Sequence, residues 1–421
     1  MTYEDAIAYL YALEVSLGWD LKLERVRAAL AAVGSPEKRY PSVLIAGTNG
    51  KGATAAMVHS VLREAGVVAG LYTSPHLVHF TERIRIGGAE IARERVAEGV
   101  ERVRRAAEGA GIPLTFFEMA TVLAFLAFAE DEVGAAVLEV GLGGRLDATN
   151  VADPVASAVV SIGYDHEAFL GDTLDAIARE KAGVMRPGRA VVLGPDLPAE
   201  ARRALVDEAG RVAARRVEAD VERPEIAAVA LRGEHMRRNA AVAIALVEEA
   251  GAAEPRLRVD ERALRAGLAR VRWPGRLDVV QGSPRVVLDG AHNREGVAAL
   301  LAALPAVLGG RRPHLLFAAL ADKPWRDMAA QLAPHVASVI ATSVGGARGV
   351  PARDLAAAFA GVPASAEPEP RRAFARLVAS GDRATPILVA GSLFLVGAVY
   401  EALLERLGVA SVFDRLPELA A

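Results

Sequence analysis

Apolar residues along the chain follow two different patterns. Short runs rich in β-branched residues, typical of buried strands, alternate with longer stretches in which apolar residues recur at helical spacing. In the first part of the chain this pattern predicts strands at 42–46, 136–140, 156–162 and 190–193, and helices at 54–65 and 120–129. In the second part it predicts strands at 285–288, 314–318, 338–342 and 386–390. Such alternation is typical of an α/β chain with mainly parallel sheets.

A candidate domain boundary lies between two segments rich in turn residues. The 421 residues exceed what one core usually holds, so we expect two or three domains. The turn-rich segments are Trp273-Pro274-Gly275-Arg276 and Gly282-Ser283-Pro284. We therefore expect a larger domain at 1–282 and a smaller one at 283–421. A basic, Glu-rich stretch at 202–223 is predicted to be a solvated helix and loop.

Composition narrows the function classes. The net charge of -3 gives no electrostatic reason to expect a nucleic acid or an anionic membrane as partner. The longest apolar stretch, at 119–129, is about half of the ~20 residues that a membrane helix needs. The N-terminus, MTYEDAIAYL, has early acidic residues and lacks a basic segment followed by an apolar one. We therefore expect a cytoplasmic protein, and a monomer that acts on small molecules.

Rare residue types mark candidate sites. The chain has no cysteine, which excludes disulfides, iron–sulfur clusters and thiolate zinc sites. Arg occurs 44 times and Lys only five times, while Asn occurs four times. Where Arg has replaced Lys almost everywhere, a remaining Lys is a candidate for a role that needs an amine. The five are Lys22, Lys38, Lys51, Lys181 and Lys323.

The strongest local motif is a glycine-rich loop between a predicted strand and a predicted helix, with the sequence AGTNGKGAT at 46–54. Glycines let backbone N–H groups close around phosphate oxygens, the helix N-terminus adds positive potential, and Lys51 supplies a cation. The spacing is shorter than in the general phosphate-loop pattern, and the residue after Lys51 is Gly52 instead of Ser or Thr. The alternative is a glycine-rich turn without a ligand.

Other polar segments follow predicted strands, where open parallel sheets place ligand sites. They are TSPHL at 73–77, EVGLGGRLDATN at 139–150, GYDH at 163–166 and EKAG at 180–183. An acidic residue that ends a buried strand beside a phosphate loop often holds Mg²⁺, which favours Glu139 as a ligand. Taken singly, Glu139 could be a capping acid, His166 a buried structural histidine and Lys181 a surface lysine.

These motifs resemble those of the dihydrofolate synthase/folylpolyglutamate synthase branch of the Mur ligase superfamily, over nearly the whole chain. The resemblance rests on GTNGKG, TSPHL, EVGLGGRLDATN, DH, EKAG, PGR at 274–276 and LDGAHN at 288–293. It implies an N-terminal P-loop ATPase domain with a parallel sheet and a smaller C-terminal Rossmann-like α/β domain. It also implies ATP and Mg²⁺ as cofactors.

The resemblance further implies roles for individual residues. Nucleotide contacts would come from Thr48, Asn49, Gly50, Lys51, Gly52, Ala53, Asn239, Arg276 and Asp289. Ser74, Glu139 and His166 would hold Mg²⁺, and Lys181 would be the lysine that is carbamylated in this superfamily. The pterin side of the substrate would contact Thr115, Phe116, Phe117, Glu118, Leu146, Asp147 and Ala148, with 23–25 as a weaker candidate. The chain departs from the family at Lys22, where Gly is common, and at Ala53, where Ser or Thr is usual.

The expected reaction joins L-glutamate to dihydropteroate, to the γ-carboxylate of folates, or to both. ATP phosphorylates the carboxylate, and the acyl phosphate then loses phosphate when the glutamate amine attacks. His292 or Asp289 could take the proton of that amine. We expect the site in a cleft between the domains. Lys51, Lys181, Asp289 and His292 are the catalytic candidates.

Two other functions are compatible with parts of the sequence. One is a peptidoglycan-type amino-acid ligase, with the same chemistry on another substrate. The other is a nucleotide switch or motor subunit without enzymatic amide formation. None of the five lysines lies in the Asn/Thr-Lys-x-Asp element that a GTPase needs, and an ABC-type Leu-Ser-Gly-Gly-Gln element is absent.

Overall fold

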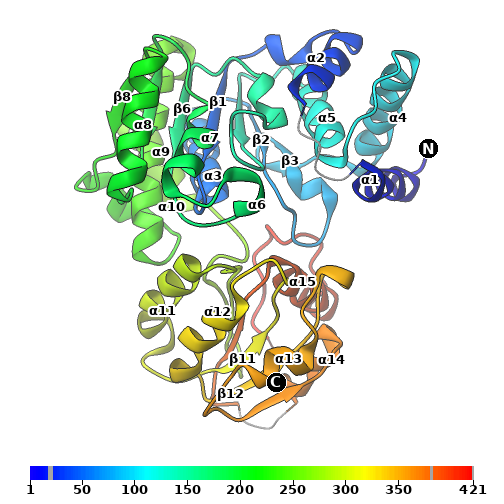
Figure 1. Ribbon diagram of the computed structural model, residues 1–421, viewed down its shortest axis with the longest axis vertical. Helices are drawn as coiled ribbons and strands as arrows, with labels where there is room; N and C mark the ends of the chain where they lie inside the picture. The colour runs from blue at the N-terminus through cyan, green and yellow to red at the C-terminus, as the bar shows by residue number, and fades with distance from the viewer. Residues whose placement is uncertain (18–21, 380–382, 420–421) are drawn as a thin grey trace. The chain divides into compact units, whose positions relative to one another are not determined.

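The computed structural model describes residues 1–17, 22–379 and 383–419. Within this part of the chain two compact units are formed, the first mainly at 1–271 and the second mainly at 272–419. Each unit contains a predominantly parallel sheet with helices, shown in Figure 1. The α/β prediction with a larger N-terminal and a smaller C-terminal part is confirmed.

The first unit contains an eight-stranded sheet in the order β4-β3-β2-β5-β1-β6-β7-β8. Its strands are β1 Ser42–Ala46, β2 Ala69–Tyr72, β3 Ile84–Ile86, β4 Ala89–Glu90, β5 Ala135–Glu139, β6 Ala156–Val159, β7 Ala190–Leu193 and β8 Arg215–Glu218. All neighbours pair in parallel except β2–β3 and β3–β4. Strand β1 lies between β5 and β6, so the loops after these three strands emerge at one edge, where ligands bind in open α/β sheets.

The helices of this unit cover an apolar sheet. They are α1 Tyr3–Leu17, α2 Leu23–Ala32, α3 Lys51–Glu64, α4 Arg93–Gly109, α5 Phe116–Glu130, α6 Glu167–Leu170, α7 Leu174–Ala182, α8 Ala199–Arg211, α9 Glu234–Ala253 and α10 Glu261–Arg270. Helix α5 contacts α1, α4 and strand β2, and its residues 118–129 are all buried. This burial explains why its sequence is apolar on every side. In the described residues no helix is both long and apolar enough to cross a membrane.

The second unit contains a six-stranded sheet in the order β13-β12-β11-β14-β10-β9, in which only β9 runs antiparallel to its neighbour. Its strands are β9 Asp278–Val280, β10 Val286–Leu288, β11 His314–Phe317, β12 Ser338–Ala341, β13 Ala364–Ala366 and β14 Ile387–Ala390. Its helices are α11 Arg294–Leu308, α12 Trp325–Leu332, α13 Ala352–Ala357, α14 Pro370–Val378 and α15 Leu393–Leu407. Buried residues form an apolar cluster on each face of this sheet.

Several strands were not predicted from the sequence, among them β2, β3, β4 and β13. Three further differences have an evident physical cause. Strand β6 ends at Val159 and not at residue 162, because the chain beyond it bonds to the glycine-rich loop. The stretch at 202–223 contains an unpredicted strand, β8, whose Arg215, Arg216 and Glu218 are exposed at the sheet edge. The second unit takes in the chain from Arg272, ahead of the expected start at 283, because β9 pairs with β10.

Candidate active site

The glycine-rich loop joins β1 to α3, and its backbone requires glycine. Gly50 precedes the helix with φ 85, in the left-handed region. A Cβ at this position would also lie 2.6 Å from Oδ1 of Asn239. Asn239, on α9, therefore lies directly against the loop, as expected if both contact one nucleotide.

The start of α3 is suited to an anion. The first backbone bond of the helix runs from Thr54 N to Gly50 O, so the N–H groups of the three preceding helical residues have no partner one turn earlier. These are Lys51, Gly52 and Ala53, and they carry the positive end of the helix dipole. The Nζ of Lys51 donates to Gly47 O at 3.0 Å and Thr48 O at 3.3 Å. Lys51 is half-buried, and its amine is held over the loop.

Thr48 and Asn49 hold the loop in place. Thr48 N donates to Ser161 O at 2.9 Å, and Asn49 N donates to Ser161 Oγ at 2.9 Å. The hydroxyl of Thr48 bonds both the carbonyl and the N–H of Gly163. These contacts give both residues a structural role. Nothing in the sequence pattern singled out Ser161, which lies two residues beyond the end of β6.

Strand register places Glu139 beside the strand that leads into the loop. It pairs with Ile45 across β5 and β1, two residues before Gly47, and is 5% exposed. Its Oε2 accepts a hydrogen bond from Ser74 N at 3.0 Å, so two of the three expected metal ligands are in contact. The third, His166, has φ 53 and precedes α6. Among the described residues no group of three His, Cys, Asp or Glu forms a complete metal cage.

This donor set fits Mg²⁺ when phosphates are present. Mg²⁺ keeps several waters and is commonly bound by one or two carboxylates together with substrate phosphates, so a complete protein cage is not needed. Glu139 supplies a buried carboxylate, and the backbone N–H of Ser74 lies beside it.

Lys181 lies beneath the loop. It is on α7, only 4% exposed, and its Nζ donates to Gly47 O at 3.1 Å. Gly47 O therefore accepts from both Lys51 and Lys181. Burial, assisted by the nearby charge of Lys51, lowers the pKa of Lys181 to about 7. An exposed fraction of only 4% excludes the interpretation of Lys181 as a surface lysine, and the lowered pKa favours its neutral amine.

The acidic residues of the expected substrate pocket are engaged by neighbouring groups. Glu118 forms a capping box with Thr115 at the start of α5, and its Oε1 accepts from Arg25 at 2.9 Å. Asp147 accepts from Leu142 N and Thr149 N, both at 2.9 Å, and burial raises its pKa. We infer that both carboxylates stabilise the backbone conformation of the segments expected to line the pocket.

The apolar members of the same pocket are partly exposed. Phe116 stacks on Tyr11 with ring centroids 5.7 Å apart, and Phe117 lies 6.0 Å from Tyr72. Leu146 is half-buried, whereas Ala148 is buried at the start of the 3₁₀ turn Ala148–Val151. Aromatic and apolar surface is therefore available for a flat ring system.

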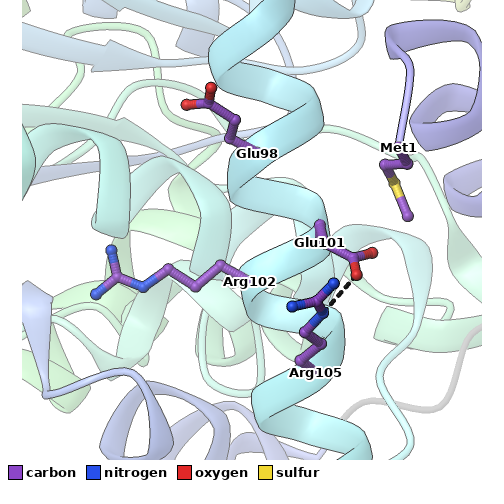
Figure 2. A pocket seen from close by; sticks show the side chains of 5 residues that line it. All are labelled: Met1, Glu98, Glu101, Arg102 and Arg105. Carbon is purple, nitrogen blue, oxygen red and sulfur yellow. Dashed lines mark hydrogen bonds and ion pairs between the residues drawn. The ribbon is translucent and has the colours of Figure 1, made fainter.

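A shallow pocket beside α4 lies apart from the residues predicted to form the active site. Figure 2 shows that it is lined by Met1 and by side chains of this helix: Glu98, Glu101, Arg102 and Arg105. Arg105 pairs with Glu101 across one helical turn. None of the predicted site residues lines it, and its Arg105–Glu101 contact is an ordinary surface ion pair.

In the second unit, Asp289 fixes the turn after β10. Its Oδ2 accepts from Leu277 N at 2.7 Å and its Oδ1 from Ala291 N at 2.8 Å. A Cβ at Gly290 would lie 2.2 Å from a guanidinium nitrogen of Arg276, so the PGR and LDGAHN segments pack tightly together. Asn293 caps α11 by accepting from Gly296 N at 2.8 Å.

His292 has a defined tautomer. Its Nδ1 lies 2.8 Å from Gly290 O. A carbonyl can only accept, so Nδ1 carries the proton and Nε2 is the basic nitrogen of the neutral ring. This arrangement is suitable for accepting a proton from a substrate.

The substitution at Ala53 leaves the start of α3 without the usual hydroxyl. The neighbouring Thr54 does not obviously replace it, because successive helical side chains point about 100° apart. Thr54 is fully buried, and its Oγ1 has no hydrogen-bond partner among the residues that the structure describes.

Comparisons with known proteins agree with this architecture. The chain matches the family described as Mur ligase middle domain over residues 45–247, and the family described as Mur ligase, glutamate ligase domain over residues 275–393. The fold, the glycine-rich loop and these matches define the protein as a Mur ligase.

Individual relatives narrow this class. The dihydrofolate synthase/folylpolyglutamate synthase of Bacillus subtilis is 36% identical over 358 residues, covering 78% of this chain and 82% of that protein. E. coli FolC in complex with DHPP and ADP has a TM-score of 0.84 and 31% identity, covering 95% of this chain and 98% of that one. The Yersinia pestis bifunctional folylpolyglutamate synthase/dihydrofolate synthase complexed with AMPPNP and Mn ion has a TM-score of 0.84 and 30% identity, covering 96% and 98%. The chain belongs to the dihydrofolate synthase/folylpolyglutamate synthase family.

The position of Lys51 leads to a first prediction. Lys51→Ala removes the cation held above Gly47 and Thr48, so we expect ADP formation to fall at least 100-fold, a typical scale for a lost transition-state contact. The thermal midpoint should change little, because the side chain is only half-buried. Coupled-enzyme measurement of ADP checks the rate. The control is Lys38→Ala, which removes an exposed lysine from the 3₁₀ turn Pro36–Lys38. Turnover near the wild-type rate would remove Lys51 from the mechanism.

Proposed function

We propose that this protein is an ATP-dependent ligase that joins L-glutamate to dihydropteroate, to the γ-carboxylate of folates, or to both. The observation that carries the proposal is the register of β5 against β1. It places the buried residue Glu139 beside Ile45, in the strand that leads into the glycine-rich loop, where Lys51 and Lys181 both donate to Gly47 O. A phosphate loop with a carboxylate beside it suits phosphoryl transfer.

The chemistry requires activation of a carboxylate, because amide formation would otherwise expel oxide. Transfer of the γ-phosphoryl group of ATP gives an acyl phosphate, and attack by the glutamate amine then releases inorganic phosphate. The chain contributes charge neutralisation and orientation through Lys51 and the first N–H groups of α3. Ser74, Glu139 and His166 would hold Mg²⁺, which would neutralise phosphate charge. Asn239, Arg276 and Asp289 would complete the nucleotide contacts.

The folate side of the reaction fits the first unit. The half-buried rings of Phe116 and Phe117 and the side chain of Leu146 offer an apolar surface for a pterin. Glu118 and Asp147 fix the segments that present this surface.

We further propose that the enzyme is a cytoplasmic monomer without a nucleic acid or membrane partner. Sedimentation at a mass well above 44.1 kDa would contradict the monomer.

A product assay tests the function and its two alternatives. Purified protein, ATP, Mg²⁺ and glutamate are offered dihydropteroate, a reduced folate, or a nucleotide-sugar acid in separate reactions. We expect mass spectrometry to show one added glutamate on at least one of the first two and none on the third. Product only on the nucleotide-sugar acid would indicate the peptidoglycan-type ligase. ATP cleavage without any amide would indicate a nucleotide switch.

Lys181 is proposed to react with CO₂. Only a neutral amine forms a carbamate, so reaction should be extensive above pH 7 and be lost as pH falls below it. An ordinary lysine, with a pKa of about 10.4, would be almost fully protonated at pH 8. We expect ¹³C NMR with labelled bicarbonate at pH 8 to show a carbamate signal that is absent in Lys181→Arg. Equal signals from both proteins would contradict the assignment.

His292 is proposed to take the proton of the attacking amine through Nε2. His292→Ala should then lower amide formation by 100-fold or more, the usual range for general acid–base catalysis, while pteroate-dependent ATP cleavage falls much less. Both products are measured in the same reaction, with His335→Ala as an exposed control. An unchanged ratio with both rates near normal would restrict His292 to a structural role in the turn.

A further inference from the structure

Two hydroxyl groups continue the pairing of β1 and β6 beyond the ends of the strands. The regular ladder finishes with Ala46 beside Val159, and Val160 N still donates to Ala46 O at 2.8 Å. After this point the glycine-rich loop turns away, so direct backbone pairing between the two segments becomes incomplete. Thr48, from the segment after β1, and Ser161, from the segment after β6, lie in this region.

Each hydroxyl takes part in two hydrogen bonds with one residue opposite. Ser161 Oγ accepts from Asn49 N at 2.9 Å and donates to Asn49 O at 2.8 Å. Thr48 Oγ1 accepts from Gly163 N at 3.0 Å and donates to Gly163 O at 3.1 Å. Each side chain thus satisfies both the N–H and the C=O of one opposing residue, as a strand would.

This arrangement has a consequence for phosphate binding. The N–H groups of Thr48 and Asn49 are both directed to Ser161 and are engaged there. The N–H groups that can turn to an anion therefore start at Gly50 and continue into the first turn of α3. Ser161 sets which part of the loop faces the nucleotide.

The same contacts also affect the segment that carries His166, a proposed metal ligand. The segment 161–163 is fixed to the loop at both of its ends and continues directly into Asp165 and His166. Asp165 in turn accepts from His166 N at 2.9 Å. A displacement of the loop is transmitted through these bonds to the segment that carries the proposed metal ligand.

We propose that Ser161 is a positioning residue that couples the phosphate loop to the metal-binding segment, so that nucleotide and divalent metal favour one another through its hydroxyl. This inference rests on the proposed function, because it assumes that the loop binds a nucleotide. Coupling of this kind is reciprocal and can be measured from either ligand.

A pair of isosteric variants isolates the hydroxyl. Ser161→Thr keeps it and Ser161→Val replaces it by a methyl group, so any effect of added bulk is common to both. Ser161→Ala removes it without added bulk, and Ser157→Ala is the matched control on buried β6. Circular dichroism and the thermal midpoint establish that each variant is folded.

The measurement is calorimetric affinity for AMPPNP, a non-hydrolysable ATP analogue, with and without Mn²⁺. For Ser161→Ala and Ser161→Val we expect about tenfold weaker binding, the scale of two lost hydrogen bonds. We also expect the gain in affinity from Mn²⁺ to shrink at least threefold. Ser161→Thr and Ser157→Ala should resemble wild type. In turnover assays the KM for ATP should rise more than kcat falls.

The outcomes separate the inference from the proposed function. If wild type binds AMPPNP but Ser161→Ala keeps the same affinity and the same Mn²⁺ gain, the positioning role is overturned. Equal losses in the Thr and Val variants would also overturn it, since the hydroxyl would then be irrelevant. If wild type itself does not bind AMPPNP, the proposed function fails and the inference with it.

Discussion

The carbonyl oxygen of Gly47 is the acceptor on which the arrangement of the site depends. It lies one residue beyond β1 and receives the amines of Lys51, from the helix that follows, and of Lys181, from α7. Two full positive charges on one oxygen repel each other, and burial disfavours the charged form of Lys181 further. In the proposed mechanism Lys51 binds phosphate as a cation, and the lowered pKa of Lys181 favours its neutral amine.

Much of this arrangement could be predicted because its causes are local or follow from strand order. The loop at 46–54 requires glycine for its backbone and lies between a strand and a helix, so its sequence is diagnostic. Ser161 could not be found in this way. A serine near the end of a strand has no characteristic spacing, and its role arises only when β6 pairs with β1. Strand β8 was missed for a related reason, because an exposed edge strand carries no buried apolar pattern.

Membership of a motif also proves a weak guide to chemistry. Glu118, Asp147 and Asp289 each accept backbone N–H groups, which fixes turns and helix starts. Sequence alone cannot separate such carboxylates from one that binds metal, because both kinds occupy the ends of elements beside the ligand. Glu139 also accepts a backbone N–H, from Ser74, and differs only in its place in the sheet. It ends a central strand and lies beside the backbone of Ser74.

The retention of lysine at two positions of this arginine-rich chain has a physical explanation. Lys51 and Lys181 each direct a single amine at a backbone carbonyl within a confined space, where the planar guanidinium of Arg has a different shape. The carbamate proposed for Lys181 would in addition need a neutral amine, and Arg does not lose its proton. Lys22 and Lys38, by contrast, are exposed, so retention of lysine by itself did not identify function. Lys51 and Lys181 instead both donate to Gly47 O in the glycine-rich loop, and this distinction required the position of α7 beside that loop.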